Sequence, residues 1–359
     1  MKEEGWDLLL ISADGREVQS ICRTEGVQHE VVPFVKGVNY VEDFISFWLL
    51  FQLIRKERPD VIHSYDSKTG FLGMLAAKLA GITHRIHSIT EMPVHAKDPQ
   101  KGLTFLEKWT FSNATSLWVN STGMLSFFTS NSGIDADKFK LLGSGSTLGV
   151  DLEKFNRQVL KENHLVAATM RILPGENDFI ILAIGALTKR KGVEDLIAAF
   201  LKSKIVSRSK LVLIGTFEPE EEPLSQDTIQ TIREHPRVVQ IDWTDHVEHH
   251  LALADVLVQP SHEEGFSNVL LEAAAMQVPI ICSNCIGNTS FIKQQKTGLV
   301  FPVGEVSILK EALEFAYVKR DTLADYSDAL FEEVNVKFDR KVMRKLQADA
   351  YRQLLKNQD

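Results

Sequence analysis

The sequence predicts two successive α/β domains, each built on a parallel sheet with helices on both faces. Short apolar runs alternate with longer helical patterns along most of the 359 residues, as in parallel α/β proteins. A single core stops growing at roughly 250 to 300 residues, so a chain of this length is expected to form about two domains. Hydrophobic residues make up 44% and charged residues 25%, which is typical of folded globular proteins.

The first domain is expected over residues 1–157. Apolar runs predict its strands at residues 7–12, 29–33, 61–63, 85–89 and 117–120, and helical patterns lie at 41–56 and 70–80. Within the first of these helices, Phe44–Ile54 is very apolar but shorter than the about 18 residues that a transmembrane helix requires. We interpret it as a helix packed on the core, and its aromatic residues leave membrane-surface contact as the alternative.

The second domain is expected over residues 158–338. Its strands are predicted at residues 179–185, 210–215, 238–241, 256–259 and 279–282, with helical patterns between them. The polar, turn-forming stretch 151–178 contains the join between the domains. A last helical pattern, within residues 339–359, has no strand after it and could pack on either domain.

Charge and cysteine content narrow the function classes. The net charge of −8 argues against nucleic acid as a partner, because such proteins usually need a basic surplus. Three cysteines are too few for a disulfide framework in a chain this long, so a reducing compartment is expected. The polar, acidic start is unlike a signal peptide, and we therefore expect a cytoplasmic protein.

The most informative segment, Pro260–Met276, follows a predicted strand and is typical of a loop that opens into a helix. Ser267 is the expected N-cap. This placement brings free backbone N–H groups and the positive end of the helix dipole to the edge of a parallel sheet where anions bind. Gly265 allows close backbone approach, and Glu272, inside the helix, can accept hydrogen bonds from two neighbouring sugar hydroxyls. Glu264, just before the helix, is expected at the same edge of the sheet.

A phosphate near carboxylates needs a compensating cation, and the loop after the strand at 179–185 offers one. Lys191 is the natural candidate, with Lys189 and Arg190 beside it. A solvated basic turn is the alternative interpretation of this cluster.

Residues 264–272, Glu-Gly-Phe-Ser-Asn-Val-Leu-Leu-Glu, resemble the signature of glycosyltransferase family 4. In that signature two glutamates are separated by seven residues, with Gly-Phe and Asn between them. Segments 185–192, 213–218, 252–257 and 297–302 resemble further parts of the family in the family's order. Segments 59–63, 68–73 and 143–151 are similar to the branch that extends capsular, O-antigen or other lipid-linked bacterial glycans.

The resemblance implies a GT-B fold, in which two Rossmann-like, doubly wound domains face a central cleft. It implies a retaining hexosyl- or N-acetylhexosaminyltransferase that uses a nucleotide-sugar, expected to be a UDP-sugar, and needs no metal or other cofactor. Catalytic roles fall to Glu264, which contacts the transferred sugar, and to Lys191, and Glu272 holds the donor ribose. The implied diphosphate site consists of Gly265, Phe266, Ser267 and Asn268 with Lys191 and Arg190.

The branch also implies an acceptor that is a glycan or is linked to undecaprenyl diphosphate, and hence peripheral contact with the inner face of the cytoplasmic membrane. On the acceptor side we expect Lys68, Ser146 and Thr147. A local patch must then attach an acidic protein to the membrane, and a solvated helix face is its alternative interpretation. The patch we expect consists of His95, Lys97, Lys101, Lys108 and Trp109.

The chain departs from the family pattern at two places. Ala186 stands where the family usually has an arginine, and we expect Lys189 or Arg190 to supply the cation instead. Residues 1–12 resemble the end of the family's first helix entering its second strand, so we expect the first strand and its glycine-rich loop to be missing. Two other functions stay open, a nucleotide-sugar epimerase on the same fold and a catalytically impaired nucleotide-binding relative.

Overall fold

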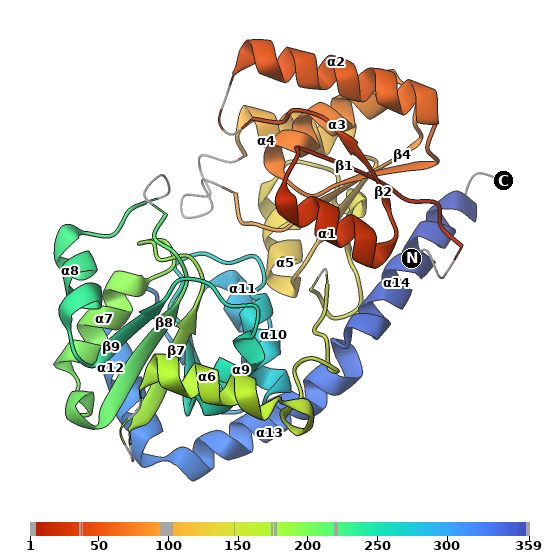
Figure 1. The fold of residues 1–359 in the computed structure, drawn as a ribbon. Coiled ribbons are helices and arrows are strands. Elements are labelled where there is room, and N and C mark those ends of the chain that lie inside the picture. Colours follow the sequence, from red (N-terminus) through yellow and green to blue (C-terminus); the bar gives the residue numbers. More distant parts are fainter. Residues whose placement is uncertain are drawn as a thin grey trace. The chain divides into compact units, whose positions relative to one another are not determined.

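The computed structural model describes residues 5–35, 37, 39–93, 103–146, 148–173, 175, 178–218 and 222–356. The chain divides into two compact units, one of Met1–Thr147 with Arg344–Asp359 and one of Leu148–Met343. Every strand pairing within the named sheets of the described residues is parallel, and helices alternate with strands (Figure 1). The predicted α/β class is therefore confirmed.

The second unit contains one six-stranded sheet in the order β12-β11-β10-β7-β8-β9. Its strands are β7 (Phe179–Ile184), β8 (Ser209–Ile214), β9 (Val238–Ile241), β10 (Val256–Gln259), β11 (Ile280–Ser283) and β12 (Leu299–Phe301). Its helices are α6 (Glu162–Ile172), α7 (Val193–Lys202), α8 (Gln226–Glu234), α9 (Val247–Leu253), α10 (Asn268–Ala275), α11 (Ile286–Thr289), α12 (Val306–Val318) and α13 (Arg320–Lys337).

Alternate residues of the central strands enter two different cores, because side chains of a strand point to opposite faces. Ile181 and Leu213 are fully buried on the face that α7 and α12 cover. Leu182 and Val212 are fully buried on the opposite face, together with residues of α10 and α13. The near-continuous apolar runs of these strands therefore reflect burial on both faces.

The strand order reverses beside β7. The chain runs from β7 to β8 and β9 on one side, and then crosses to β10, which pairs with β7 on the other side through Val256 and Ile181. The loops that follow β7 and β10 consequently leave neighbouring strand ends in opposite directions. Ligands of open parallel sheets bind at such a topological switch point.

The first unit contains two separate parallel sheets, β1-β2 and β3-β4-β5-β6. Among the described residues, β1 pairs only with β2, and β3 pairs only with β4. The strands are β1 (Leu9–Ser12), β2 (Gln28–Val31), β3 (Val61–Ser64), β4 (His84–Ile89), β5 (Ser116–Val119) and β6 (Phe139–Leu141). The strands predicted in both units lie within two residues of those observed, whereas β6 and β12 were not predicted.

The helices of the first unit are α1 (Arg16–Glu25), α2 (Tyr40–Glu57), α3 (Ser67–Leu79), α4 (Phe105–Asn113) and α5 (Thr122–Asn131). The last helix, α14 (Arg340–Lys356), begins in the second unit, and its residues from Arg344 onward belong to the first. There, Tyr351 stacks on Trp118 with ring centroids 5.2 Å apart. In the part of the chain that the structure describes, no helix is long and apolar enough to cross a membrane.

The apolar helix α2 packs on the core along one face only. Asn39 caps its N-terminus by accepting a hydrogen bond from the backbone N–H of Glu42. Leu50 and Ile54 are buried in a cluster with residues of α3, as the core interpretation predicted. Its opposite face is exposed.

Candidate functional site

The two loops predicted to carry function meet at the switch point of the second unit. Lys191, in the loop after β7, places its Nζ 2.7 Å from Oε1 of Glu264, in the loop after β10. The same oxygen accepts hydrogen bonds from Gln259 Nε2 at 3.0 Å and from Ser261 Oγ at 2.9 Å. The Glu264 side chain is only 12% exposed, so these three donors fix its orientation at a site that is largely shielded from solvent.

Glycine at position 192 allows the two loops to approach this closely. Gly192 has φ +72°, and a Cβ there would lie 2.1 Å from the carbonyl oxygen of Pro260. The backbone N–H of His262 also donates to the carbonyl of Arg190 at 2.8 Å. Together these contacts hold Lys191 opposite Glu264.

A second glycine fixes the other side of the Glu264 loop. The backbone N–H of Gly287 donates to the carbonyl of Glu264 at 3.0 Å. A Cβ on Gly287 would lie 2.6 Å from that carbonyl and 2.7 Å from the carbonyl carbon of Gly265. Any larger residue at position 287 would therefore displace the loop.

The N-terminus of α10 follows Glu264 as predicted. Ser267 is the N-cap, but its side chain makes no capping hydrogen bond, so the first turn lacks its usual side-chain acceptor. Phe266 is buried and packs on Phe291 and Phe338, each at 5.8 Å between ring centroids. Gly265 is buried and Asn268 is exposed. The segment is thus anchored by Phe266 while the helix N-terminus can accept an anion.

Glu272, on α10, lies in a different electrostatic environment from Glu264. Burial raises the pKa of its carboxyl group to about 7, against the opposing effect of Lys154 and Arg340. No hydrogen bond to this carboxylate is found among the described residues. Glu272 therefore has acceptor capacity that the protein itself does not use.

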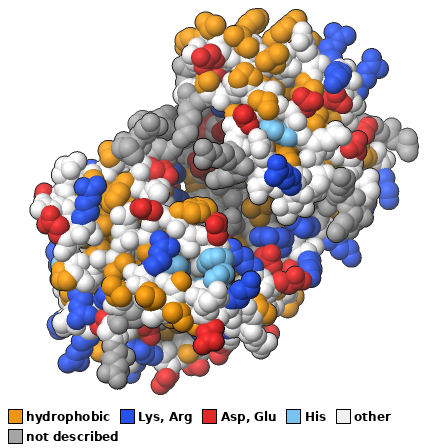
Figure 2. Space-filling model, in the orientation of Figure 1, with side chains coloured by type: hydrophobic (Ala, Val, Ile, Leu, Met, Phe, Trp, Pro, Cys, Tyr) orange, Lys and Arg blue, Asp and Glu red, His pale blue; other side chains and the backbone are white. Residues whose placement is uncertain are grey.

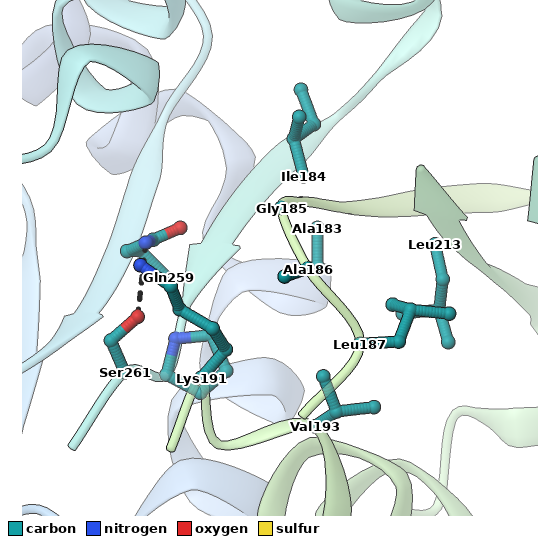
Figure 3. A pocket seen from close by; sticks show the side chains of 11 residues that line it. Ala183, Ile184, Gly185, Ala186, Leu187, Lys191, Val193, Leu213, Gln259 and Ser261 are labelled. Carbon is teal, nitrogen blue, oxygen red and sulfur yellow. Dashed lines mark hydrogen bonds between the residues drawn. The ribbon is translucent and has the colours of Figure 1, made fainter. Parts of the chain in front are cut away.

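A pocket lies at the C-terminal ends of β7 and β10. It is lined by Ala183, Gly185, Ala186, Leu187 and Lys191, with Gln259 and Ser261 opposite (Figure 3). Ala186 occupies the position where the resemblance leads us to expect arginine. Lys189 is exposed and Arg190 is half-buried in the same loop.

The residues expected on the acceptor side belong to the first unit. Lys68 donates to the carbonyls of Val35 and Gly37, both at 2.6 Å, and pairs with Asp43 at 2.5 Å. Ser146 is buried with φ +66°, and its N–H donates to the carbonyl of Asn120 at 2.7 Å. Thr147 lies outside the described residues. In the expected membrane patch, Lys108 and Trp109 are exposed on α4, and His95, Lys97 and Lys101 lie outside the described residues.

The sequence interpretation missed three residues that shape the site, namely Gln259, Ser261 and Gly287. Gln259 ends an otherwise apolar strand and Ser261 lies two residues later, after Pro260, and polar residues at such a strand end were a usable signal. Gly287 could not be found from its local sequence, because its role depends on the approach of α11 to the Glu264 loop.

Three histidines also gather between α6 and α9, outside this site. Ligand atoms of His164, His246 and His249 lie within 4.8 Å of one another. The Nε2 atom of His249 accepts a hydrogen bond from the backbone N–H of Lys161 at 3.2 Å. The lone pair of this nitrogen is therefore already engaged within the protein, and we assign no ligand to the cluster.

Comparison with known proteins identifies the family. Residues 170–330 match the family described as Glycosyl transferases group 1, and residues 1–145 match the family described as Glycosyl transferase 4-like domain. The chain belongs to the group 1 glycosyltransferases.

Two relatives match this group 1 glycosyltransferase over most of its length. The capsular polysaccharide biosynthesis glycosyltransferase CapM of Staphylococcus aureus is 27% identical over 319 residues, covering 88% of this chain and 81% of CapM. The UDP-Gal:alpha-D-GlcNAc-diphosphoundecaprenol alpha-1,3-galactosyltransferase of Escherichia coli is 25% identical over 317 residues, covering 83% of this chain and 79% of that protein.

The fold of this group 1 glycosyltransferase matches a solved structure. HepE of Anabaena in complex with UDP-glucose superimposes with a TM-score of 0.80 at 16% identity, covering 96% of this chain and 91% of HepE. The predicted GT-B fold is thereby confirmed.

Proposed function

We propose that this glycosyltransferase moves a hexose or N-acetylhexosamine from a UDP-sugar, with retention, to a glycan or undecaprenyl-diphosphate-linked acceptor in the synthesis of a bacterial surface polysaccharide. The observation that carries the proposal is the Lys191–Glu264 pair at the switch point, next to the open N-terminus of α10. The names of the relatives support the acceptor class, since one acts on a diphosphoundecaprenol-linked sugar. Such an acceptor implies work at the cytoplasmic face of the membrane.

For the donor, we assign the ribose hydroxyls to Glu272, whose carboxylate has unused acceptor capacity. The diphosphate is assigned to the α10 N-terminus from Gly265 to Asn268, with Lys191 and Arg190. Hydrogen bonds from three donors reach Oε1 of Glu264, so we assign the transferred sugar to its Oε2.

Negative charge grows on the diphosphate as its bond to the sugar breaks. Lys191 and the backbone N–H groups of α10 supply the compensating positive potential, and this arrangement needs no metal ion or other cofactor. On the acceptor side we propose Ser146 and Thr147, with Lys68 acting indirectly by holding the carbonyls of Val35 and Gly37.

Calorimetric titration with UDP, GDP and ADP tests the donor assignment. We expect selective UDP binding that Glu272→Ala abolishes and that Glu332→Ala, at an exposed glutamate of α13, leaves unchanged. Equal binding of all three nucleotides would refute the choice of UDP. Binding that survives Glu272→Ala would refute the ribose assignment.

The reaction itself is tested by incubating UDP-sugars with and without a lipid-diphosphate-linked sugar acceptor and determining the product anomer by NMR. The proposal requires an acceptor-dependent product whose anomeric configuration matches the donor. Conversion of the UDP-sugar without acceptor would instead identify an epimerase. UDP binding without any turnover across the acceptor panel would favour a catalytically impaired relative.

A further inference from the structure

The outer face of α2 is apolar although it is exposed. Three pairs of neighbouring residues, each four residues after the last, point away from the core along this face. Their exposed fractions run from 40% to 85%, and they are Tyr40, Val41, Phe44, Ile45, Trp48 and Leu49. The inner face is apolar as well, so α2 is hydrophobic on nearly all sides, as in helices covered by protein or lipid.

The apolar surface continues on α4. Phe105 is 67% exposed and Trp109 is 41% exposed. The Trp109 ring lies 6.0 Å from Phe71 of α3, and α3 packs against both α2 and α4. Figure 2 shows hydrophobic side chains gathered at the top of the view, over α2. We call the outward apolar residues of α2 and α4 the aromatic face.

Charges of both signs lie beside the aromatic face, with a small basic surplus once the ion pairs are taken into account, although the whole chain is acidic. Arg55, Lys56 and Glu57 lie in the last turn of α2, where Lys56 pairs with Glu57 at 2.9 Å, and Lys108 is exposed on α4. Of the nearby acids, Asp43 pairs with Lys68 and Glu107 closes the capping box of α4, whereas Glu42 is exposed on the first turn of α2. This rim complements a surface of anionic headgroups.

We propose that the aromatic face docks on the surface of an anionic lipid bilayer. Trp and Tyr favour the level of the lipid headgroups, and Phe enters the boundary with the acyl chains. Lysine and arginine at the rim reach the headgroups. The choice of a lipid bilayer as the partner rests on the proposed function, because a diphosphate-linked lipid acceptor is itself held in such a bilayer.

Vesicle binding tests the proposal without any donor or acceptor. The intact chain is floated with vesicles of phosphatidylglycerol and phosphatidylcholine, or of phosphatidylcholine alone. We expect binding to the anionic vesicles that weakens with salt. The double variant Phe44→Gln/Trp48→Gln should lower the partition coefficient more than about tenfold, because two large apolar side chains no longer leave water.

Matched controls separate the aromatic face from apolar exposure in general. Phe315→Gln/Val318→Gln, at exposed positions of α12 in the second unit, should leave partitioning unchanged. Circular dichroism melts confirm that the variants fold, which is expected since glutamine is a good helix former. Equal partitioning of both double variants and the wild type would overturn the proposal.

Fluorescence quenching by brominated lipids locates the contact directly. The chain has five tryptophans, and Trp48 and Trp109 belong to the aromatic face. Quenching should disappear in Trp48→Phe/Trp109→Phe while vesicle binding persists. Quenching that survives this change would place the contact elsewhere and refute the proposal.

Two further outcomes distinguish the possible failures. Concentration-dependent dimers that Phe44→Gln/Trp48→Gln abolishes, without vesicle binding, would show that a second copy covers the face and would overturn the lipid assignment. Transfer to a water-soluble acceptor without vesicle binding would refute the aromatic face and leave the proposed function intact. Vesicle binding without transfer would support the aromatic face and count against the proposed function.

Discussion

The two compact units share a fold class but differ in where their apolar side chains lie. In the second unit, strand residues such as Ile181 and Leu213 are fully buried under helices, and the polar site occupies the strand ends. In the first unit, Phe44 and Trp48 of α2 are 65% and 49% exposed. We infer a division of labour, in which the second unit binds the donor through rigid loops and the first unit contacts the lipid bilayer through the aromatic face. Changes at the donor loops should therefore act on soluble and membrane-bound acceptors alike.

The largest effect is expected for Lys191→Met. It removes the cation nearest to the developing charge, and kcat should fall about 10²- to 10³-fold with soluble and vesicle-bound acceptors. Lys202→Met, at an exposed position of α7, is the matched control. The division of labour fails if the loss appears only with vesicle-bound acceptor.

Gly192→Ala should come next in size. The methyl group would meet the Pro260 carbonyl at 2.1 Å, so the loop must shift and donor affinity should fall about tenfold or more. Gly304→Ala is a sharp control, because its φ is also positive, at +79°, but a Cβ there meets nothing within 4 Å. Both variants should lose about 1 kcal/mol of unfolding free energy from φ strain. The difference in UDP affinity between the two variants, measured by calorimetric titration, then reports the effect of the clash alone. Equal donor affinity in the two variants would contradict the account of the loop.

Glu272 predicts a pH dependence in the second unit. Its pKa of about 7 means that the carboxylate is mostly ionised at pH 8 and mostly neutral at pH 6, so UDP affinity should rise about tenfold across that interval. In Glu272→Gln the rise should vanish. A wild-type affinity that is flat between these pH values would show that ribose binding does not depend on this carboxylate.

The same group affects stability with a defined sign. Because the folded-state pKa lies above the ordinary value of 4.5, ionisation costs folding free energy as the pH rises through about 7. Glu272→Gln should therefore gain stability relative to wild type between about pH 4 and pH 8, measured by chemical unfolding at both values.

The smallest effect is expected for the double variant Lys189→Ala/Arg190→Ala. If these residues replace the arginine absent at position 186, UDP affinity should fall about three- to tenfold. An unchanged affinity would mean that Lys191 and the α10 N-terminus suffice. Vesicle binding should be unaffected in either case, because Lys189 and Arg190 belong to the second unit and the aromatic face belongs to the first.

Much of the fold was predictable because buried parallel strands carry long apolar runs. Residues 179–185 were predicted as a strand and β7 spans Phe179–Ile184. β6 and β12 were missed because each has only three residues and lies at the edge of its sheet. The pairing of Lys191 with Glu264 followed from two loops at strand ends, although 73 residues separate them in sequence. Gln259 and Ser261 bind Glu264 within five residues of sequence, and their polar side chains at a strand end could have indicated this, whereas the approach of Gly287 depends on tertiary packing that local pattern does not encode.

The aromatic face shows a different limit of sequence interpretation. A helix that is apolar on both sides gives the same composition whether one face or both faces are covered. Core packing of Leu50 and Ile54 and exposure of Phe44 and Trp48 coexist on α2, so the two interpretations of this segment were not exclusive. Only the structure separates the faces.

Gly287 has a consequence for efforts to redesign donor choice. The peptide between Glu264 and Gly265 is clamped by α11, so mutations in this loop will tend to inactivate the enzyme before they change its preference. Ala186, which is half-buried and lines the pocket, lies outside this contact, whereas its pocket neighbours Ala183 and Leu187 are buried in the core. Directed evolution toward other sugars should therefore diversify position 186 and keep the clamped loop constant.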